Sequence, residues 1–124
     1  MIPTVFQVAL GGAIGAAARY GIGVALFRPG AVFPFGVLAA NIIGCFAMGL
    51  VVVYLGQKSL SHLNPFLMTG VLGGFTTFSA FSLEAYTLFE RGAVGQAAIY
   101  VLVSVAVSLL GLVAGVFLMR GLLG

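Results

Sequence analysis

Hydrophobic residues fill four long stretches of this chain, and polar residues gather in the short segments between them. The stretches run approximately over residues 3–26, 35–56, 65–89 and 94–119. Each reaches the ~20 apolar residues that a helix needs to span a bilayer. We therefore expect an all-α membrane protein with four transmembrane helices in a single domain, residues 1–124, because the spans leave no room for a soluble domain.

The short connections predict a hairpin-linked bundle with both termini on one side of the membrane. Lys58 and Arg120 then fall on the side of the termini, while Arg19, Arg28 and Arg91 fall on the other side. The positive-inside rule needs a clear excess of Lys and Arg to fix an orientation, so this near balance allows insertion either way up. We therefore expect dual topology and an antiparallel homodimer.

The third stretch interrupts the apolar pattern near its centre with GVLGGFTTFSAFSLE, residues 70–84. Hydroxyl groups and adjacent glycines at membrane depth are tolerated where protein or a water-filled path satisfies the backbone. As a straight helix the stretch would reach roughly 37 Å, which exceeds the ~30 Å of a bilayer core. We expect the glycine pair 73–74, followed by Thr76 and Thr77, to break the helix near the bilayer midplane, where free carbonyls could coordinate a cation.

Residues that follow the expected break suggest an anion pathway. Phe78 and Phe81 are three positions apart and share a face if the helix resumes, and Ser79 and Ser82 share an adjoining face. The edge of an aromatic ring is positive, so ring edges beside hydroxyl donors could hold a small anion without a full charge that would trap it. Ordinary packing of phenylalanines in a membrane helix is the alternative.

Polar and charged residues in the other spans each have more than one interpretation. Asn41 could line a pathway or form an interhelical hydrogen bond. Tyr100, Ser104 and Ser108 follow an i, i+4, i+8 row that suits a pore or a partner helix rather than lipid. Arg19 could snorkel to the membrane surface, pair with Glu84, or concentrate anions in an aqueous vestibule. Pairs of small residues four apart, such as Gly11 with Gly15, Gly70 with Gly74 and Gly111 with Gly115, indicate close helix packing.

Composition excludes several function classes. Only 6% of the residues are charged, against roughly 25% in a soluble domain. The basic residues are scattered, so we expect no nucleic-acid partner. Cys45 and His62 are the only residues of their types, and no cluster of nucleophile, base and carboxylate is evident, so we expect no enzyme.

These motifs resemble the Fluc (CrcB) family of small bacterial fluoride channels. The resemblance spans the chain and rests on GGAIGAAARY at residues 11–20, FGVLAANIIGCFAMG at 35–49 and, above all, the motif at 70–84. It implies an antiparallel, dual-topology homodimer in the bacterial inner membrane, with two fluoride pathways and a structural sodium ion (Na+) at its centre.

The resemblance also implies roles for individual residues. The fluoride pathway residues are Asn41, Phe78, Phe81, Thr77, Ser79, Ser82, Tyr100 and Ser108; the charged residues near pathway ends are Arg19 and Glu84; and the sodium ligands are the backbone carbonyls of Gly73 and Thr76. Val37 stands where family members often have a threonine, which removes one hydroxyl from the implied pathway.

The implied function is passive, fluoride-selective export that gives fluoride resistance. A proton-coupled exporter of the small multidrug-resistance kind is the alternative, since it also has four short spans in an antiparallel dimer. It needs a titratable carboxylate deep in the bundle, whereas Glu84 and Glu90 both lie near membrane ends. A purely structural membrane assembly factor is a third reading; it would explain the glycine motifs but not the hydroxyls and aromatic rings of the third span.

Overall fold

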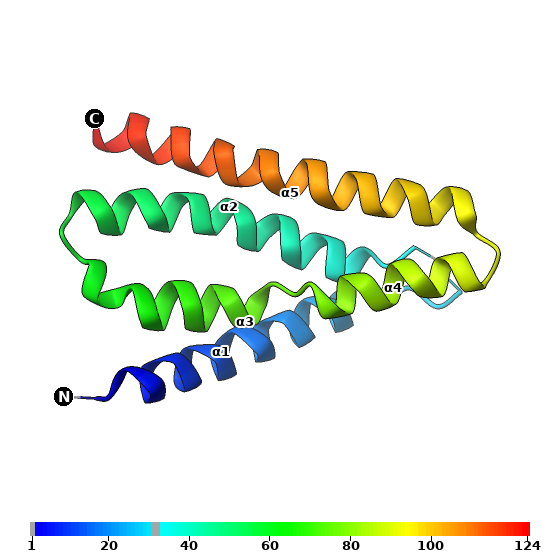
Figure 1. Ribbon diagram of the computed structural model, residues 1–124, viewed down its shortest axis with the longest axis horizontal. Coiled ribbons are helices and arrows are strands. Elements are labelled where there is room, and N and C mark those ends of the chain that lie inside the picture. Colours follow the sequence, from blue (N-terminus) through cyan, green and yellow to red (C-terminus); the bar gives the residue numbers. More distant parts are fainter. Residues whose placement is uncertain (1, 31–32) are drawn as a thin grey trace.

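The protein is a bundle of helices in which both termini lie at the same end (Figure 1). The computed structural model describes residues 2–30 and 33–124. Its elements are α1 (Thr4–Ala25), α2 (Phe35–Gln57), η1 (Ser61–Leu63), η2 (Pro65–Leu72), α3 (Gly73–Phe75), α4 (Ser79–Glu90) and α5 (Val94–Leu123). Four helical segments in the described residues, the third running over Ser61–Glu90, are long and apolar enough to cross a membrane. The predicted all-α architecture and its four spans are confirmed.

The third span is broken near its middle, as predicted, but the break begins after the glycine pair. Gly73 and Gly74 belong to α3, and the chain leaves helical geometry at Thr76, whose φ of −92° and ψ of 158° are extended. The prediction is therefore confirmed for Thr76 and Thr77, which lie at the break, and wrong for the glycine pair, which stays helical. The sequence argument used helix propensity, whereas close packing explains Gly74: a Cβ there would lie 2.7 Å from the carbonyl oxygen of Gly12 on α1.

Glycine pairs bring the spans into backbone contact, as the small-residue motifs predicted. Gly11 and Gly15 are buried against η2 and α3, where an added Cβ would overlap the backbone carbonyls of Phe66 and Val71. A Cβ at Gly115 on α5 would lie 3.2 Å from the Cα of Gly49 on α2. In lipid, where the hydrophobic effect does not drive helices together, this close packing holds the bundle.

Two helices end in the same hydrogen-bonded turn, which sets the short connections. At the end of α4, Gly92 has a φ of 82° and Ala93 donates its N–H to the Leu88 carbonyl. At the end of α2, Ser59 has a φ of 57° and Leu60 donates to the Leu55 carbonyl. This is the Schellman arrangement, in which the residue of positive φ is usually glycine; Ser59 is the exception here.

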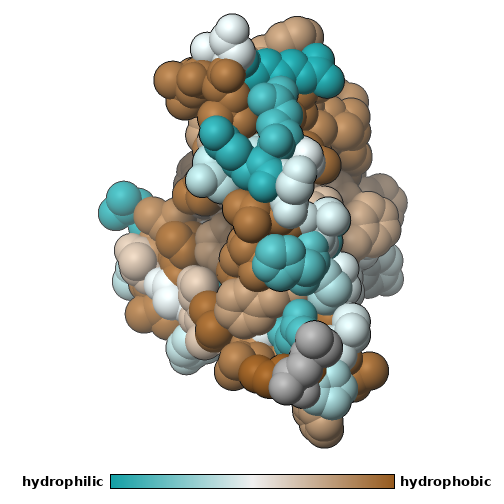
Figure 2. All heavy atoms as spheres, turned by 90° about the vertical axis from the view of Figure 1, so that its left-hand side faces the viewer, coloured by the Kyte–Doolittle hydropathy of each residue, from teal (hydrophilic) through white to brown (hydrophobic). Residues whose placement is uncertain are grey.

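The end of the bundle that carries the termini is partly hydrophilic. Figure 2 shows hydrophilic residues running down this face between hydrophobic ones. Gln57, Lys58 and Ser59 at the end of α2 are exposed. Along the sides of the bundle, by contrast, many large apolar side chains are exposed, among them Phe6, Leu102 and Leu110. That distribution is expected of a chain whose sides face lipid or a partner and whose end faces water.

Candidate functional site: a cavity at the helix break

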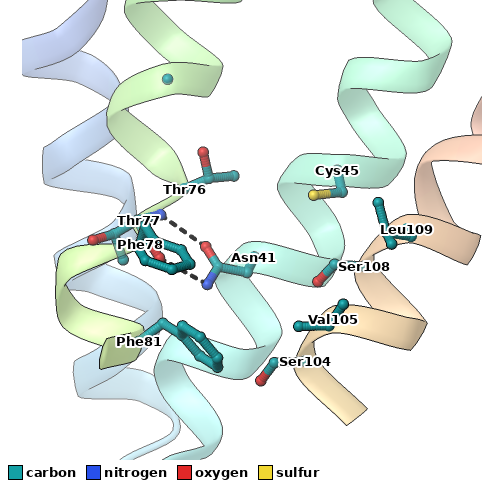
Figure 3. Close-up of a pocket in the computed structure, with 11 residues that line it drawn as sticks. Asn41, Cys45, Thr76, Thr77, Phe78, Phe81, Ser104, Val105, Ser108 and Leu109 are labelled. Carbon is teal, nitrogen blue, oxygen red and sulfur yellow. Dashed lines mark hydrogen bonds between the residues drawn. The ribbon is translucent and has the colours of Figure 1, made fainter. Parts of the chain in front are cut away.

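A cavity of about 460 Å³ lies at the break, between α2, the broken third span and α5 (Figure 3). Its polar walls come from Asn41 on α2, from Thr76 and Thr77 at the break, and from Ser104 and Ser108 on α5. Phe78 and Phe81 supply its aromatic wall. The structure therefore brings together, from three separate spans, most of the residues that the sequence assigned to the fluoride pathway.

Asn41 holds the break in place through two hydrogen bonds to one residue. Its Oδ1 accepts the backbone N–H of Thr77 at 2.8 Å, and its Nδ2 donates to the Thr77 carbonyl at 3.0 Å (Figure 3). The side chain thus replaces the helical partners that Thr77 loses. An amide NH2 carries two hydrogens, so Asn41, which lines the cavity, keeps one further N–H to donate. The interhelical hydrogen bond and the donor expected from the sequence therefore coexist in one side chain.

Thr77 starts the second half of the broken helix. Its Oγ1 accepts the N–H of Ala80 at 3.1 Å, which is the hydrogen bond that an N-cap residue makes to a free helical N–H. Ser79 Oγ lies 3.2 Å from the same hydroxyl. The cluster of hydroxyls read from the sequence thus has a structural role at this helix start, in addition to lining the cavity.

These diverted hydrogen bonds leave backbone carbonyls free at the break. In an unbroken helix the Gly73 and Thr76 carbonyls would accept from the N–H groups of Thr77 and Ala80. Both N–H groups are bonded instead to side-chain oxygens, of Asn41 and Thr77 respectively. Within residues 2–30 and 33–124, the carbonyls of Gly73, Phe75 and Thr76 accept no backbone hydrogen bond across the break. Free, uncharged oxygens of this kind are suitable ligands for a hard monovalent cation.

The aromatic rings continue beyond the cavity as an unbroken series. The Phe78 and Phe81 rings have centroids 5.5 Å apart, as their spacing predicted. The ring centroids of Phe81 and Tyr100 on α5 are 5.3 Å apart. The ring centroids of Tyr100 and Phe33 are 5.5 Å apart, and the two ring planes lie edge to face at 87°. Phe33 precedes α2 and carries no sequence signal, because only folding places it beside Tyr100. Phe78 is 77% exposed, so it projects beyond the surface of its own chain.

Hydroxyl groups on α5 lie buried along this wall without partners. The oxygens of Tyr100, Ser104 and Ser108 make no hydrogen bond among the described residues. Ser104 is only 5% exposed and lines the cavity, although its membership of the polar row on α5 was the sole hint in the sequence. A buried polar group without a partner costs about 1–3 kcal/mol, which indicates that a ligand or water completes these groups.

The structure places the remaining candidates outside this cavity. Arg19 donates from Nε to the Gly74 carbonyl at 3.2 Å, so it supports the backbone just before the break and does not pair with Glu84. Glu84 is half-buried in a second cavity at the end opposite the termini, together with Val37. Ser79 and Ser82 are exposed on α4 and do not line the break cavity.

Comparison with known proteins bears on what this arrangement does. Residues 6–116 match the family described as CrcB-like protein, Camphor Resistance (CrcB). The chain belongs to the CrcB family. A CrcB relative from Ruegeria sp. (strain TM1040), named fluoride-specific ion channel FluC, is 58% identical over 99% of both chains. Relatives of the same name from Roseobacter denitrificans and Paracoccus denitrificans are each 54% identical, over 92% and 96% of this chain and 93% and 96% of their own lengths.

Membership of the CrcB family also settles the location of the chain. Its four apolar spans and its bacterial relatives make it a multi-pass protein of the inner membrane. The resemblance to this family, inferred from the motifs at residues 11–20, 35–49 and 70–84, is confirmed.

Proposed function

We propose that this chain is a fluoride-specific ion channel that lets fluoride leave the cell down its electrochemical gradient and so gives fluoride resistance. The observation that carries the proposal is the cavity at the break, where aromatic rings and unpartnered hydroxyls converge. It occurs in a chain that is 58% identical over almost its whole length to a relative named fluoride-specific ion channel. A passive channel makes and breaks no covalent bond, so the proposal includes no enzymatic activity.

The chemistry of the cavity suits a small, strongly hydrated anion. Ser104 and Ser108 offer O–H donors, and Asn41 offers one N–H, which together replace water around the ion. Phe78 and Phe81 add ring edges with partial positive charge. No Lys or Arg lines the cavity among the described residues, so binding stays weak enough for the ion to leave.

The alternative of a proton-coupled exporter lacks a proton carrier in this cavity. Glu84 lines the separate cavity at the end of the bundle. The carboxylate of Glu90 accepts a hydrogen bond from Tyr86 at 2.6 Å, also near that end of α4. Neither carboxylate reaches the break, where a coupled exporter would need to bind protons and substrate in turn. We therefore favour a channel.

A test of the proposal is fluoride efflux from liposomes that contain the purified protein, measured with a fluoride electrode while the membrane potential is clamped with valinomycin. We expect efflux that carries current and reverses at the fluoride equilibrium potential. Phe78→Ile should reduce it strongly, whereas Phe6→Ile, which changes another exposed ring far from the break, should not. Electrically silent exchange, or equal flux in the two variants, would count against a channel through this cavity.

The proposal includes an antiparallel, dual-topology homodimer. Support comes from the near balance of basic residues between the two ends and from the exposed ring of Phe78, which a second chain would cover. In such a dimer the two-fold axis lies in the membrane plane, so a break halfway along the third span can meet its own copy. C-terminal reporter tags should be found on both membrane faces in comparable amounts. Tags confined to one face would contradict dual topology.

The proposal also includes a structural sodium ion between the two breaks. The carbonyls of Gly73 and Thr76 fit this role because both have lost their helical N–H partners. With two chains, the ion would be held by backbone oxygens alone, and it would place one positive charge between two anion pathways. Replacing sodium with N-methylglucamine should lower the melting temperature and the dimer fraction of the purified protein. Identical values in both salts would argue against a sodium site.

A further inference from the structure

A second cavity, of about 300 Å³, lies at the end of the bundle opposite the termini. It is bounded by the α1–α2 connection and by the C-terminal part of α4, which Figure 1 shows beside each other at that end. Arg28 from the connection, and Glu84 and Arg91 from the other side, line it. Unlike the cavity at the break, this one therefore has charged walls.

The charges of this end cavity leave an excess of positive potential. Arg28 and Arg91 are exposed, and neither donates a side-chain hydrogen bond or forms an ion pair within the described residues. Glu84 is half-buried and supplies the single negative charge of the lining. The nearby carboxylate of Glu90 is engaged by the Tyr86 hydroxyl. Two arginines against one glutamate leave one net positive charge in a concave site, where the field acting on an anion is concentrated.

A series of packed aromatic rings runs from the end cavity to the break cavity. Phe33 lines the end cavity, and its ring packs against Tyr100. Tyr100 in turn contacts Phe81, whose ring lines the break cavity. The unpartnered Tyr100 hydroxyl lies on this wall. The arginines and the break cavity therefore lie at the two ends of one packed aromatic series, which also carries the Tyr100 hydroxyl.

We propose that Arg28 and Arg91 form an outer fluoride-capture site that fills the pathway from this end. The inference rests on the proposed channel function and adds to it two residues that bind the ion before it reaches the cavity at the break. Fixed charges of this kind raise the local anion concentration and the rate of arrival, by about 10- to 1000-fold in strongly focused cases. Their effect falls when added salt shortens the Debye length, which is about 10 Å at 0.1 M.

The test compares fluoride efflux from liposomes over a series of fluoride concentrations, at low ionic strength and with added impermeant salt. The capture variant is Arg28→Gln with Arg91→Gln. The matched control is Lys58→Gln with Arg120→Gln, which removes the same charge from the opposite end of the chain, at residues that line neither cavity. A third variant, Arg28→Lys with Arg91→Lys, keeps the charge and changes only the head group.

For the capture variant we expect a three- to tenfold higher fluoride concentration at half-maximal flux, an unchanged maximal flux, and a difference that disappears with added salt. The control and the lysine variant should match the wild-type protein. An unchanged half-maximal concentration, or an equal shift in the control variant, would overturn the capture site while leaving the channel intact. Wild-type liposomes without fluoride current would instead overturn the channel function, and with it the capture site.

Discussion

Asn41 has two proposed roles, holding the backbone of Thr77 at the break and donating an N–H to an anion in the cavity. Asn41→Asp is the substitution that separates these roles most sharply. The change keeps the shape of the side chain and an oxygen that accepts the Thr77 N–H, but it replaces the donor to the Thr77 carbonyl with a second oxygen. It also places a negative charge on the wall of the cavity. Two unit charges about 4 Å apart repel by about 4 kcal/mol at an effective dielectric constant of about 20.

At about 1.4 kcal/mol for each factor of ten, that repulsion lowers fluoride occupancy by about three orders of magnitude. We therefore expect fluoride efflux from Asn41→Asp liposomes to fall to the level of empty liposomes. The carboxylate loses the hydrogen bond to Thr77, faces the Thr77 carbonyl oxygen and carries a charge at membrane depth, so we expect a lower melting temperature as well. Size-exclusion chromatography checks that the variant assayed is still folded.

Two controls accompany this measurement. Gln57→Glu makes the same amide-to-carboxylate change at the exposed end of α2, outside the break cavity, and should leave efflux unchanged. Asn41→Ala removes both hydrogen bonds without adding charge; we expect it to lose about 2 kcal/mol of stability and only part of the flux. Efflux from Asn41→Asp within threefold of the wild-type rate would refute the placement of Asn41 on the anion pathway.

Three further predictions follow from particular contacts. Ser104→Ala removes a buried hydroxyl without a partner, so we expect about tenfold slower efflux with unchanged or slightly raised melting temperature. Ser82→Ala, on the exposed side of α4, should change neither the efflux nor the melting temperature. A loss of stability in Ser104→Ala would show that the hydroxyl is structural. Gly15→Ala would force a Cβ against the Val71 carbonyl and should reduce the yield of folded protein, while Gly21→Ala on the same helix, with open space around its Cβ, should be tolerated. Equal yields would contradict the close packing of α1 on η2 and α3. Ser59→Gly relieves a left-handed backbone conformation and should stabilise the protein by about 1 kcal/mol in thermal unfolding, with Ser59→Ala giving no gain.

Hydrophobic pattern alone predicted the helices and their order. The four spans, the common side of the termini and the interruption of the third span all follow from stretches of apolar residues that must satisfy their backbone within a bilayer. The pairing of Phe78 with Phe81 also followed from the sequence, because residues three apart share a helical face. These features depend on local spacing, which the sequence contains.

The exact start of the break could not be predicted in this way. Weak helix formers placed the expected break across the glycine pair 73–74, Thr76 and Thr77, but both glycines stay helical. Close packing explains Gly74, where a Cβ would lie 2.7 Å from the Gly12 carbonyl oxygen on α1. The chain departs from helical geometry at the position where Asn41, from another span, and the hydroxyl of Thr77 accept the freed N–H groups. Contacts between spans thus outweighed local propensity.

The sequence by itself determined that this is a four-span membrane protein of the CrcB family with a polar interruption in its third helix. Tertiary structure decided what the interruption does: it placed Arg19 on the Gly74 carbonyl, joined Phe33 to the aromatic wall, and buried the Ser104 hydroxyl in the cavity. The physical reason is that the deciding contacts join residues far apart in the sequence. Periodicity reports which residues share a face of one helix, whereas a pathway is built where faces of different helices meet.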